Sequence, residues 1–263
     1  MLSLANLLRF VLVCFGGGLL LTSCKYEELA QADYPQQILY MPTAKNGLFI
    51  INSISTTGTY RFTVDLASKK VVVPLGVYRG GVSVDGDLPV TIAANPDTVS
   101  RLISSSALVG TVVLPVDKLV LPAAVTIGAG KNSAAFDLKI DLNYLLANPS
   151  QKLAIGVGIN SSASPVNPLL KTTLISFDPT ILKATPNFTT KADAATPQKI
   201  TFTNTSLNAV GYSWDFGDGT APVTDPAPIY TYTKAGTYTV TLTATGITGS
   251  DYAVKKTTTL TIP

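Results

Sequence analysis

The residues that could do chemistry in this chain are limited by two amino-acid types. Histidine is absent, and cysteine occurs twice, as Cys14 and Cys24. Without histidine, neither a Ser-His-Asp triad nor a Cys-His pair or Cys/His zinc site can form. The carboxylates are aspartates apart from Glu27 and Glu28, and they fall in predicted turns and on outward strand faces. That placement does not favour the facing pair that glycoside hydrolysis needs. We therefore expect no enzymatic activity, no metal site and no cofactor.

An apolar leader precedes Cys24. Arg9 is the only charged side chain in residues 1–23, and Phe10–Leu21 is a run of twelve uncharged residues. A helix needs about 20 apolar residues to cross a bilayer, so this run is too short to span and is typical of the core of a secretory signal. The sequence predicts a signal peptide over residues 1–23. Its removal would also remove Cys14, so the mature chain could form no internal disulfide.

The last residues of the leader, Leu21-Thr22-Ser23, together with Cys24 resemble the bacterial lipobox. The resemblance implies recognition of Leu21, Thr22 and Ser23 by a signal peptidase, cleavage before Cys24, and attachment of lipid to the Cys24 thiol. Two or more acyl chains give stable membrane attachment, whereas one gives only marginal binding. The alternatives are a plain cleaved signal or an uncleaved anchor, in which Cys24 has no role.

Lys25-Tyr26-Glu27-Glu28 follows Cys24 directly. A lysine and an acidic pair at this place are similar to the surface-export signal of Bacteroidota-type lipoproteins. The resemblance implies a lipid-anchored protein of the outer membrane that faces the cell exterior. The alternatives are a solvated stem and a protein that faces the periplasm. We interpret residues 24–37 as the lipidated cysteine and a flexible stem.

The composition of the body favours two β-domains. The chain has 263 residues, 46% hydrophobic and only 13% charged, with 20 glycines and 17 prolines. β-Branched residues and tyrosine are abundant and favour strands, and the glycines and prolines between them favour turns. The fold class we predict is all-β, with two antiparallel, immunoglobulin-like β-sandwich domains in tandem after the signal peptide. From Cys24 onward 18 basic and 16 acidic residues are scattered, which argues against a nucleic-acid partner.

The first predicted domain covers residues 38–180. Alternating apolar residues predict strands around 60–66, 71–78, 88–94, 136–142 and 153–159, and a last strand ending at Phe177. Asn95 is expected to cap the N-terminus of a helix whose first residue is Pro96. This helix, the only one expected here, should end near Ser106. Ala154, Gly156 and Gly158 alternate with the apolar residues of their strand, which indicates close packing on that face.

One glycine-rich stretch of this domain, Gly128-Ala129-Gly130-Lys131, could suggest a phosphate-binding loop. A phosphate loop needs glycine in place of Val125 and serine or threonine in place of Asn132, and it joins a strand to a helix rather than two strands. We interpret it as a turn.

The strand order of this domain, behind a lipobox and a stem, resembles a domain of unknown function found at the N-terminus of Bacteroidota surface lipoproteins. Those proteins are often encoded beside glycan-capture machinery. The resemblance implies no functional residue for this chain, because that family has no established site.

The second predicted domain covers residues 186–263. Tyr212, Trp214 and Phe216 alternate on one face, and Asp218-Gly219 signals a tight turn. Two stretches, 214–219 and 235–242, closely resemble the polycystic-kidney-disease (PKD) repeat. The motif residues, to which the resemblance assigns structural roles, are Trp214, Asp215, Phe216, Gly217, Asp218, Gly219, Gly236 and Tyr238.

The PKD resemblance implies an extracellular spacer or binding module without catalysis. Tyr230 departs from the family, in which histidine is common, and the change is expected to alter a local hydrogen bond only. Some PKD domains bind calcium near their turns. Asp215, Asp218 and Asp225 are the residues to test for this, but a turn-forming role explains them better.

Two functions remain after these exclusions. The first is binding of an extracellular glycan or another polymer in a nutrient-capture system. Sugar sites usually need exposed aromatic residues, and because the PKD pattern places Trp214 in the core, Tyr78 and Tyr252 are the candidate platforms. The second is a structural or adhesive spacer that holds a protein–protein contact away from the membrane, which scarce aromatic residues and near-neutral charge also suit.

Overall fold

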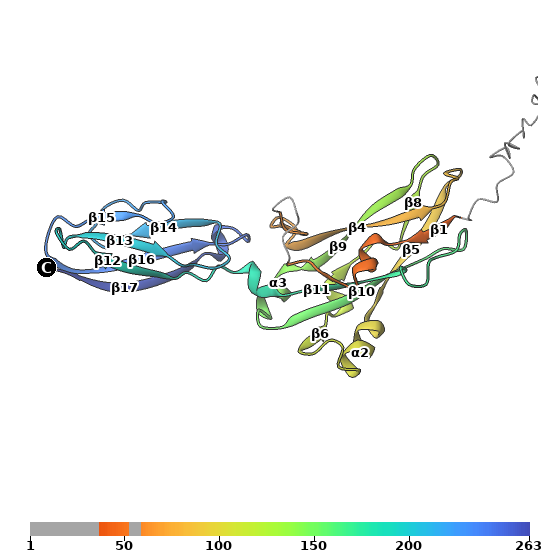
Figure 1. Cartoon of the computed structure of the whole chain (residues 1–263), viewed down its shortest axis with the longest axis horizontal. Coiled ribbons are helices and arrows are strands. Elements are labelled where there is room, and N and C mark those ends of the chain that lie inside the picture. Colours follow the sequence, from red (N-terminus) through yellow and green to blue (C-terminus); the bar gives the residue numbers. More distant parts are fainter. Residues whose placement is uncertain (1–36, 53–58) are drawn as a thin grey trace, which may run out of the picture. The chain divides into compact units, whose positions relative to one another are not determined.

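The computed structural model describes residues 37–52 and 59–263. The predicted signal peptide, Cys24 and the stem lie outside the described residues. The described chain forms two β-sandwiches, each built from two sheets (Figure 1). The predicted all-β class is confirmed.

The first sheet of the first sandwich contains five strands. In sheet order they are β1 (Ile38–Tyr40), β4 (Lys70–Gly80), β9 (Ser133–Asp141) and β7 (Leu119–Val120), with β3 (Thr63–Asp65) also paired to β4. All of these pairs are antiparallel. The register places Tyr40 opposite Tyr78, and Tyr78 opposite Ser133. These three residues therefore form one row across the sheet.

The second sheet contains six strands. In order they are β2 (Leu48–Ile50), β11 (Thr172–Phe177), β10 (Lys152–Asn160), β5 (Leu88–Asn95) and β8 (Ala124–Ile127), with β6 (Thr111–Val113) also paired to β10. The pairs of β2 with β11 and of β6 with β10 are parallel. The predicted antiparallel sandwich is confirmed apart from these two short strands, which return to the sheet through longer connections instead of hairpins.

Alternation of apolar side chains builds the core between these sheets. On β4 the inward residues Val71, Val73, Leu75 and Val77 are buried, and on β10 the inward residues run from Leu153 to Ile159. A strand turns successive side chains to opposite faces, so period two is what a half-buried strand requires. The predicted strands around 71–78 and 153–159 are confirmed.

Two helical segments show where sequence patterns succeed and fail. The helix α2 (Pro96–Ser104) begins as predicted, with the Asn95 side chain accepting a hydrogen bond from the Thr98 N–H. A second helix, α3 (Leu142–Ala147), was not expected, and Leu142 belongs to it rather than to the preceding strand. The Asp141 side chain accepts from the Tyr144 N–H and so starts this helix as an N-cap.

The predicted strand around 60–66 is shorter in the structure. Only Thr63–Asp65 forms β3, and Leu66 is 46% exposed. Asp65 accepts hydrogen bonds from the Ser68 N–H and hydroxyl, which turn the chain after β3. Short 3-10 turns complete the described chain: η2 (Pro42–Asn46), η3 (Val116–Lys118), η4 (Pro179–Leu182) and η5 (Ser250–Tyr252).

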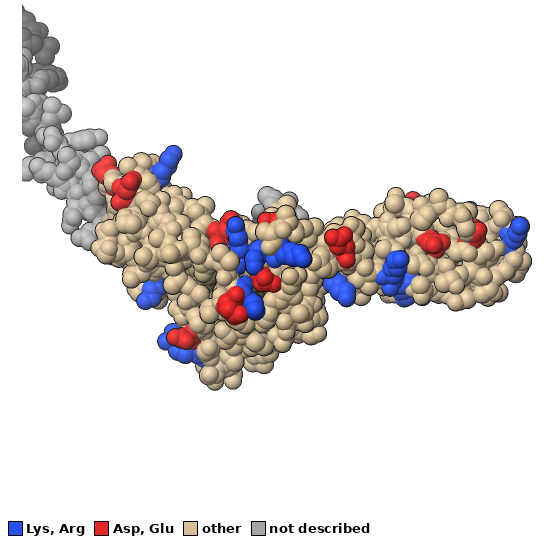
Figure 2. Space-filling view, turned by 180° about the vertical axis from the view of Figure 1, so that it is seen from behind, with Lys and Arg blue, Asp and Glu red and all other residues tan. Residues whose placement is uncertain are grey.

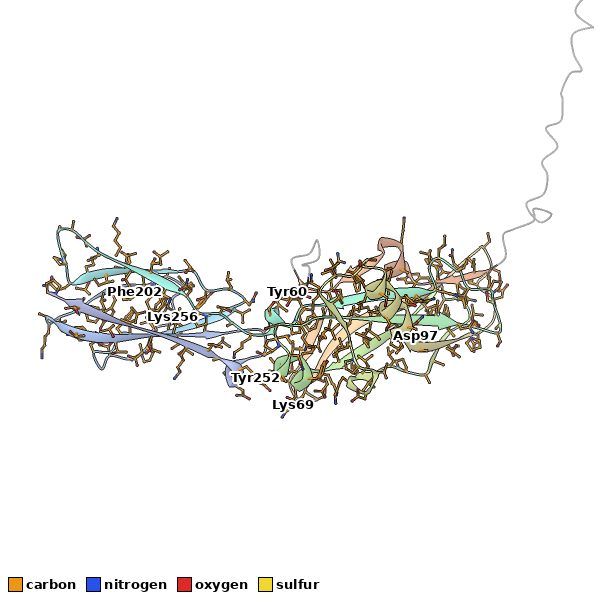
Figure 3. The ribbon with its side chains drawn as sticks, turned by 90° about the horizontal axis from the view of Figure 1, so that it is seen from below. Tyr60, Lys69, Asp97, Phe202, Tyr252 and Lys256 are labelled. Carbon is orange, nitrogen blue, oxygen red and sulfur yellow. The ribbon has the colours of Figure 1, made fainter. Side chains whose placement is uncertain are left out.

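The second sandwich has two three-stranded sheets. One contains β12 (Phe188–Ala192), β13 (Lys199–Asn204) and β15 (Ile229–Thr231), and the other β14 (Gly211–Asp215), β16 (Gly236–Thr245) and β17 (Val254–Ile262). Phe202 of β13 points between the two sheets of this domain (Figure 3). It and Trp214 of β14 are fully buried, with ring centroids 5.4 Å apart. Aromatic packing between the sheets thus forms the core of this domain.

Candidate functional site

The predicted PKD motif residues build one end of the second sandwich. Trp214 is buried and donates from its indole nitrogen to the Asp225 carbonyl at 2.9 Å, and Phe216 is buried in the same core, where both rings pack on Phe202. Gly217 has φ +77°, and a Cβ atom there would lie 2.5 Å from the Thr239 carbonyl oxygen. Gly219 has φ +85°, and both conformations favour glycine. Gly217 lets the turn lie against β16, whereas Gly219 is required only by its backbone conformation.

At the other end of the motif, Gly236 begins β16 and Tyr238 follows two residues later. The Tyr238 hydroxyl donates to the Lys234 carbonyl at 2.9 Å, and its ring stacks on that of Tyr232 with centroids 4.3 Å apart. The Tyr232 hydroxyl in turn donates to the Phe216 carbonyl. Both stretches that resemble the PKD repeat therefore meet through aromatic rings, which gives these motif residues packing roles.

The three aspartates considered for calcium each hold their own turn. Asp215, Asp218 and Asp225 accept hydrogen bonds from the backbone N–H two residues later. The part of the chain that the structure describes contains no cluster of three His, Cys, Asp or Glu residues that could hold a metal ion. These contacts agree with the turn-forming interpretation.

Tyr230, the departure from the family pattern, lies beside Asp218. Its hydroxyl donates to the Asp218 carboxylate at 2.5 Å, and its ring stacks on Phe216 with centroids 3.8 Å apart. Burial alone would raise the pKa of Asp218, but the hydrogen bonds from Tyr230 and Thr220 outweigh it and hold that pKa below its ordinary value. Tyrosine at this position therefore fixes the carboxylate of the turn.

Two tyrosines form an exposed platform on the outer face of the first sheet. Tyr78 is 39% exposed, and Tyr40, directly opposite on β1, is half-buried. Their ring centroids are 5.9 Å apart and the ring planes differ by 35°. A Cβ atom at Gly76 would lie 3.1 Å from the Tyr78 ring, and one at Gly80 would lie 3.7 Å from the Tyr40 ring. Each ring therefore lies back over a glycine of β4. We call this pair the tyrosine platform.

A hollow of about 270 Å³ adjoins the tyrosine platform. Its lining includes Pro42, Thr43, Gly76, Tyr78 and Ser133, and contains no charged side chain. Within the described ranges, neither phenol hydroxyl of the platform makes a hydrogen bond or ion pair in the chain. The site thus combines an exposed aromatic face, a shallow uncharged depression and hydroxyl groups at its rim.

The structure gives the two candidate platform tyrosines different surroundings. Tyr78 has Tyr40 beside it, whereas Tyr252 lies in η5, is half-buried and lines a separate hollow with Lys183 and Lys255. No ring contact involves Tyr252 within 37–52 and 59–263. Sequence reasoning missed Tyr40, because the glycine under its ring is Gly80 of the neighbouring strand β4 and no local sequence pattern connects the two.

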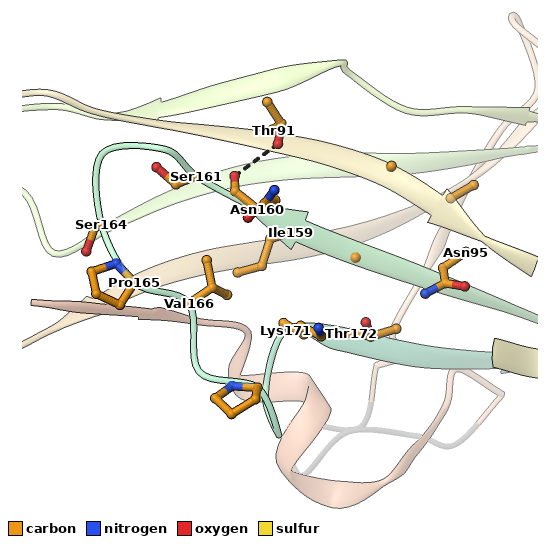
Figure 4. A pocket seen from close by; sticks show the side chains of 14 residues that line it. Thr91, Asn95, Ile159, Asn160, Ser161, Ser164, Pro165, Val166, Lys171 and Thr172 are labelled. Atoms are coloured by element: carbon orange, nitrogen blue, oxygen red, sulfur yellow. Dashed lines mark hydrogen bonds between the residues drawn. The ribbon is translucent and has the colours of Figure 1, made fainter. Parts of the chain in front are cut away.

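The outer face of the second sheet carries a groove of about 520 Å³, which we call the polar groove. Its lining residues come from β5, β10, β11 and the loop that follows β10 (Figure 4): Thr91, Ala93, Ala94, Asn95, Gly158, Ile159, Asn160, Ser161, Ser164, Pro165, Val166, Pro168, Lys171 and Thr172. Six of these fourteen residues carry a hydroxyl or a side-chain amide. Lys171 is the single charged residue of the lining.

Small residues on β10 explain both the packing and the opening of this face. A Cβ atom at Gly156 would lie 2.6 Å from the Asn95 carbonyl oxygen, so the chain before α2 packs directly on it. A Cβ atom at Gly158 would meet Thr172 Oγ1 only at 3.5 Å, and Gly158 lies on the floor of the polar groove. The predicted close packing is confirmed at Gly156, whereas Gly158 leaves space.

The glycine-rich loop after β8 is held by Arg79 rather than open to a phosphate. Arg79 is only 5% exposed and donates to five backbone carbonyls, those of Val84, Asp85, Gly86, Gly128 and Lys131. Buried guanidinium groups need their donors satisfied, and these carbonyls supply the acceptors. Arg79 therefore ties two loops together. The period-two pattern of β4 that places Val77 inside also places Arg79 inside, so the sequence could have predicted that this arginine is buried.

Charged side chains do not form a one-signed surface on the face drawn in Figure 2. Lysine and arginine lie there among aspartates, separated by wide uncharged areas. Among the ion pairs of the described residues, Lys70 contacts Asp141 at 3.0 Å. Within the same residues, no helix is both long enough and apolar enough to cross a membrane.

Family models match both sandwiches. A model for a PKD domain matches residues 177–262, and a model for an N-terminal domain matches residues 35–166, half of the chain. The chain belongs to the family of this N-terminal domain. It joins that domain to a C-terminal PKD domain, as the sequence motifs predicted.

Individual relatives cover smaller or more distant parts. The pre-pro-metalloprotease PrtV of Vibrio cholerae is 58% identical over 38 residues, which is 14% of this chain and only 4% of that protein. The solved PKD1 domain of PrtV is 34% identical, with 30% of this chain and 96% of that chain covered and a TM-score of 0.27. The activity of the protease therefore does not carry over.

Two solved Bacteroides structures resemble a larger part of the chain. A proposed carbohydrate-binding protein of Bacteroides ovatus is 12% identical, covering 79% of this chain and 64% of that one, with a TM-score of 0.42. An auxiliary nutrient-binding protein of Bacteroides thetaiotaomicron is 14% identical, covering 82% and 71%, with a TM-score of 0.39. At these values the family assignment rests on the family models alone.

Proposed function

We propose that this protein is a lipid-anchored outer-membrane lipoprotein that faces the cell exterior and binds an extracellular glycan without catalysing a reaction. The observation that carries the binding function is the tyrosine platform. The C–H faces of sugar rings are apolar and pack on aromatic faces, while sugar hydroxyls bond to polar groups at the rim. Tyr78 offers such a face, and Ser133 offers a rim hydroxyl beside it.

The domain composition supports an extracellular role. A PKD domain of the kind predicted from Trp214 to Tyr238 implies a spacer or binding module outside the cell. The lipobox at Cys24 supplies an anchor for it.

Affinity electrophoresis of residues 25–263 against a panel of polysaccharides tests the binding function. The wild-type chain should be retarded by at least one polymer. Tyr78→Ala should weaken that binding about tenfold or more, because removal of a central aromatic contact typically has such an effect. Tyr252→Ala is the matched control and should leave it unchanged. Absence of retardation on every polymer would overturn the proposal.

The anchor has its own test in cells that make the protein. Metabolic labelling with radioactive palmitate should mark the wild-type chain and not Cys24→Ser. Protease added to intact cells should remove the wild-type PKD domain if it faces outward. Equal labelling of both chains would rule out Cys24 as the acyl acceptor, and protection from the protease would place the domain in the periplasm.

A spacer that holds a protein contact is the second candidate. The observation that favours it is the exposure of Leu207 and Val210, 65% and 67% exposed on the segment before β14. Pull-down from intact cells distinguishes the two functions. A protein partner lost with Leu207→Ser, together with no retention on polysaccharides, would favour the spacer.

A further inference from the structure

The polar groove is separate from the tyrosine platform and lies on the outer face of the other sheet. Several of its polar groups are not used by the fold. Within the described part of the chain, the side-chain amide of Asn160, the hydroxyl of Thr172 and the ammonium of Lys171 make no hydrogen bond or ion pair. Amides and hydroxyls can both donate and accept, which is what a polyhydroxylated ligand requires.

Backbone contacts hold the wall of the groove in place. The loop after β10 is tied to β1 and the residue that follows it: the Leu39 N–H donates to the Pro165 carbonyl, the Asn167 N–H to the Leu39 carbonyl, and the Met41 N–H to the Leu170 carbonyl. Ser164 is 9% exposed, and its hydroxyl donates to the Gln37 carbonyl. The groove is therefore formed before any ligand arrives, which reduces the entropy lost on binding.

The polar groove has a positive charge on one side only. Lys171 at the start of the β11 side carries the only charge in the lining, and no carboxylate lines the groove. Figure 4 shows Lys171 and Thr172 along one side of the groove and Thr91 and Ser161 along the other. An anionic group is thus favoured beside Lys171, and neutral hydroxyls are favoured along the rest.

We propose that the polar groove is a second saccharide site that takes an acidic sugar unit, with Lys171 facing its carboxylate or sulfate group. The Asn160 amide and the Thr172 hydroxyl bind the sugar hydroxyls, together with the side-chain nitrogen of Asn95, whose oxygen caps α2. The inference deepens the proposed glycan-binding function by assigning a second site and a ligand class. Gly158 lies on β10 and Lys171 directly before β11, in the sheet that does not contain Tyr78, so the two proposals fail separately.

Gly158 provides a variant that fills the groove without disturbing the fold. It has an extended conformation, and a Cβ atom there makes only ordinary contacts, the nearest at 3.5 Å. Valine suits a strand position, so Gly158→Val should fold normally and place its methyl groups in the groove. Gly211→Val on β14 is the matched control, since its Cβ atom would meet Thr245 at 3.7 Å.

The experiment measures binding of residues 25–263 to two pairs of polymers: polygalacturonate with its full methyl ester, and dextran sulfate with dextran. The wild-type chain should prefer the charged member of at least one pair, and the pair identifies carboxylate or sulfate. Gly158→Val should weaken that binding more than tenfold, and Gly211→Val should not. Lys171→Met should weaken it about threefold at low salt, as an exposed ion pair predicts, with Lys152→Met as the control.

The other possible results of this experiment each contradict one part of the proposals. Binding that Gly158→Val leaves intact but Tyr78→Ala abolishes would overturn the groove and keep the proposed function. Equal binding of charged and neutral polymers would overturn the acidic class. Absence of binding to these polymers and to the whole neutral panel would overturn both proposals.

Discussion

The two sandwiches of this chain use aromatic rings in opposite ways. In the PKD domain, five of the nine residues of the buried core are aromatic: Phe188, Phe202, Trp214, Phe216 and Tyr232. In the first sandwich, three of the 26 buried core residues are aromatic, and the rest are aliphatic apart from methionine. The tyrosine platform of that domain lies outside, on its first sheet. Aromatic rings therefore stabilise the core of the PKD domain, whereas on the first sandwich the rings of the tyrosine platform are available for contact with a ligand.

Domain size explains this difference. A small domain buries a smaller fraction of its surface, so each core residue must contribute more area, and aromatic side chains contribute the most. The larger first domain fills its interior with branched aliphatic residues on paired strands. Aromatic residues there are free for the outer face. Exposed rings in the first domain therefore suggest binding, while buried rings in the PKD domain indicate stability.

The largest effect we predict is in the PKD core. Phe202→Ala should lower the free energy of unfolding of that domain by about 3–5 kcal/mol, because it leaves a cavity against Trp214 and Phe216. Trp214 is the only tryptophan, so its fluorescence reports this domain alone. Urea unfolding followed by tryptophan emission measures the shift.

The same variant tests whether the two domains are energetically separate. Far-ultraviolet circular dichroism reports both domains, so the transition of the first sandwich is the one that tryptophan emission does not show. It should stay where it is in wild type. A Phe202→Ala chain whose tryptophan transition moves by less than about 1 kcal/mol would contradict the aromatic-core interpretation. Phe202→Leu, which keeps most of the volume, should show a smaller loss.

The next effect is in the first sandwich. Arg79→Met should lower its free energy of unfolding by about 2–3 kcal/mol, because five backbone carbonyls lose a charged donor. Here circular dichroism should shift while tryptophan emission does not, the reverse of Phe202→Ala. Arg101→Met, at an exposed position of α2, is the control and should change little. Coincident shifts of both probes would show that the domains unfold together.

The sequence could predict the parts of the fold that depend on local patterns. Period-two alternation located β4 and β10, and Asn95-Pro96 located the start of α2. The motif from Trp214 to Gly219 identified the PKD domain. It could not predict the parallel pairing of β2 and β6, because three-residue strands carry almost no periodic signal and their partners are distant in sequence.

The candidate sites were less predictable. Tyr78 was a candidate platform, but its partner Tyr40 lies 38 positions earlier, and only the β1–β4 register brings them together. The polar groove exists because nothing packs closely on Gly158, whereas the Asn95 backbone packs directly on Gly156. The period-two pattern places both glycines on the same face of β10 and cannot distinguish them. The end of β9 was also misread, because Asp141 continues the strand pattern while its side chain starts α3.

Asp141 supports the smallest predicted effect. The Tyr144 N–H, and then the Lys70 ammonium, hold the pKa of its carboxyl below the ordinary value. The folded state therefore binds fewer protons than the unfolded state in mildly acidic solution. The stabilisation is complete above the unfolded-state pKa of about 4 and is lost as the pH falls through the lower folded pKa. Asparagine keeps the N-cap, so Asp141→Asn removes only the charge beside Lys70 and the start of α3, and should lower stability near neutral pH by about 0.5 kcal/mol.

Urea unfolding followed by circular dichroism, repeated from about pH 6 to about pH 3, measures this effect. The difference between wild type and Asp141→Asn should shrink as the solution becomes more acidic, and the tryptophan transition of the PKD domain should be the same in both chains. Asp137→Asn on the same strand is the control, since its carboxylate makes no hydrogen bond or ion pair in the described residues. A pH-independent difference would mean that packing around α3, rather than the charge of Asp141, stabilises this end of the first sandwich.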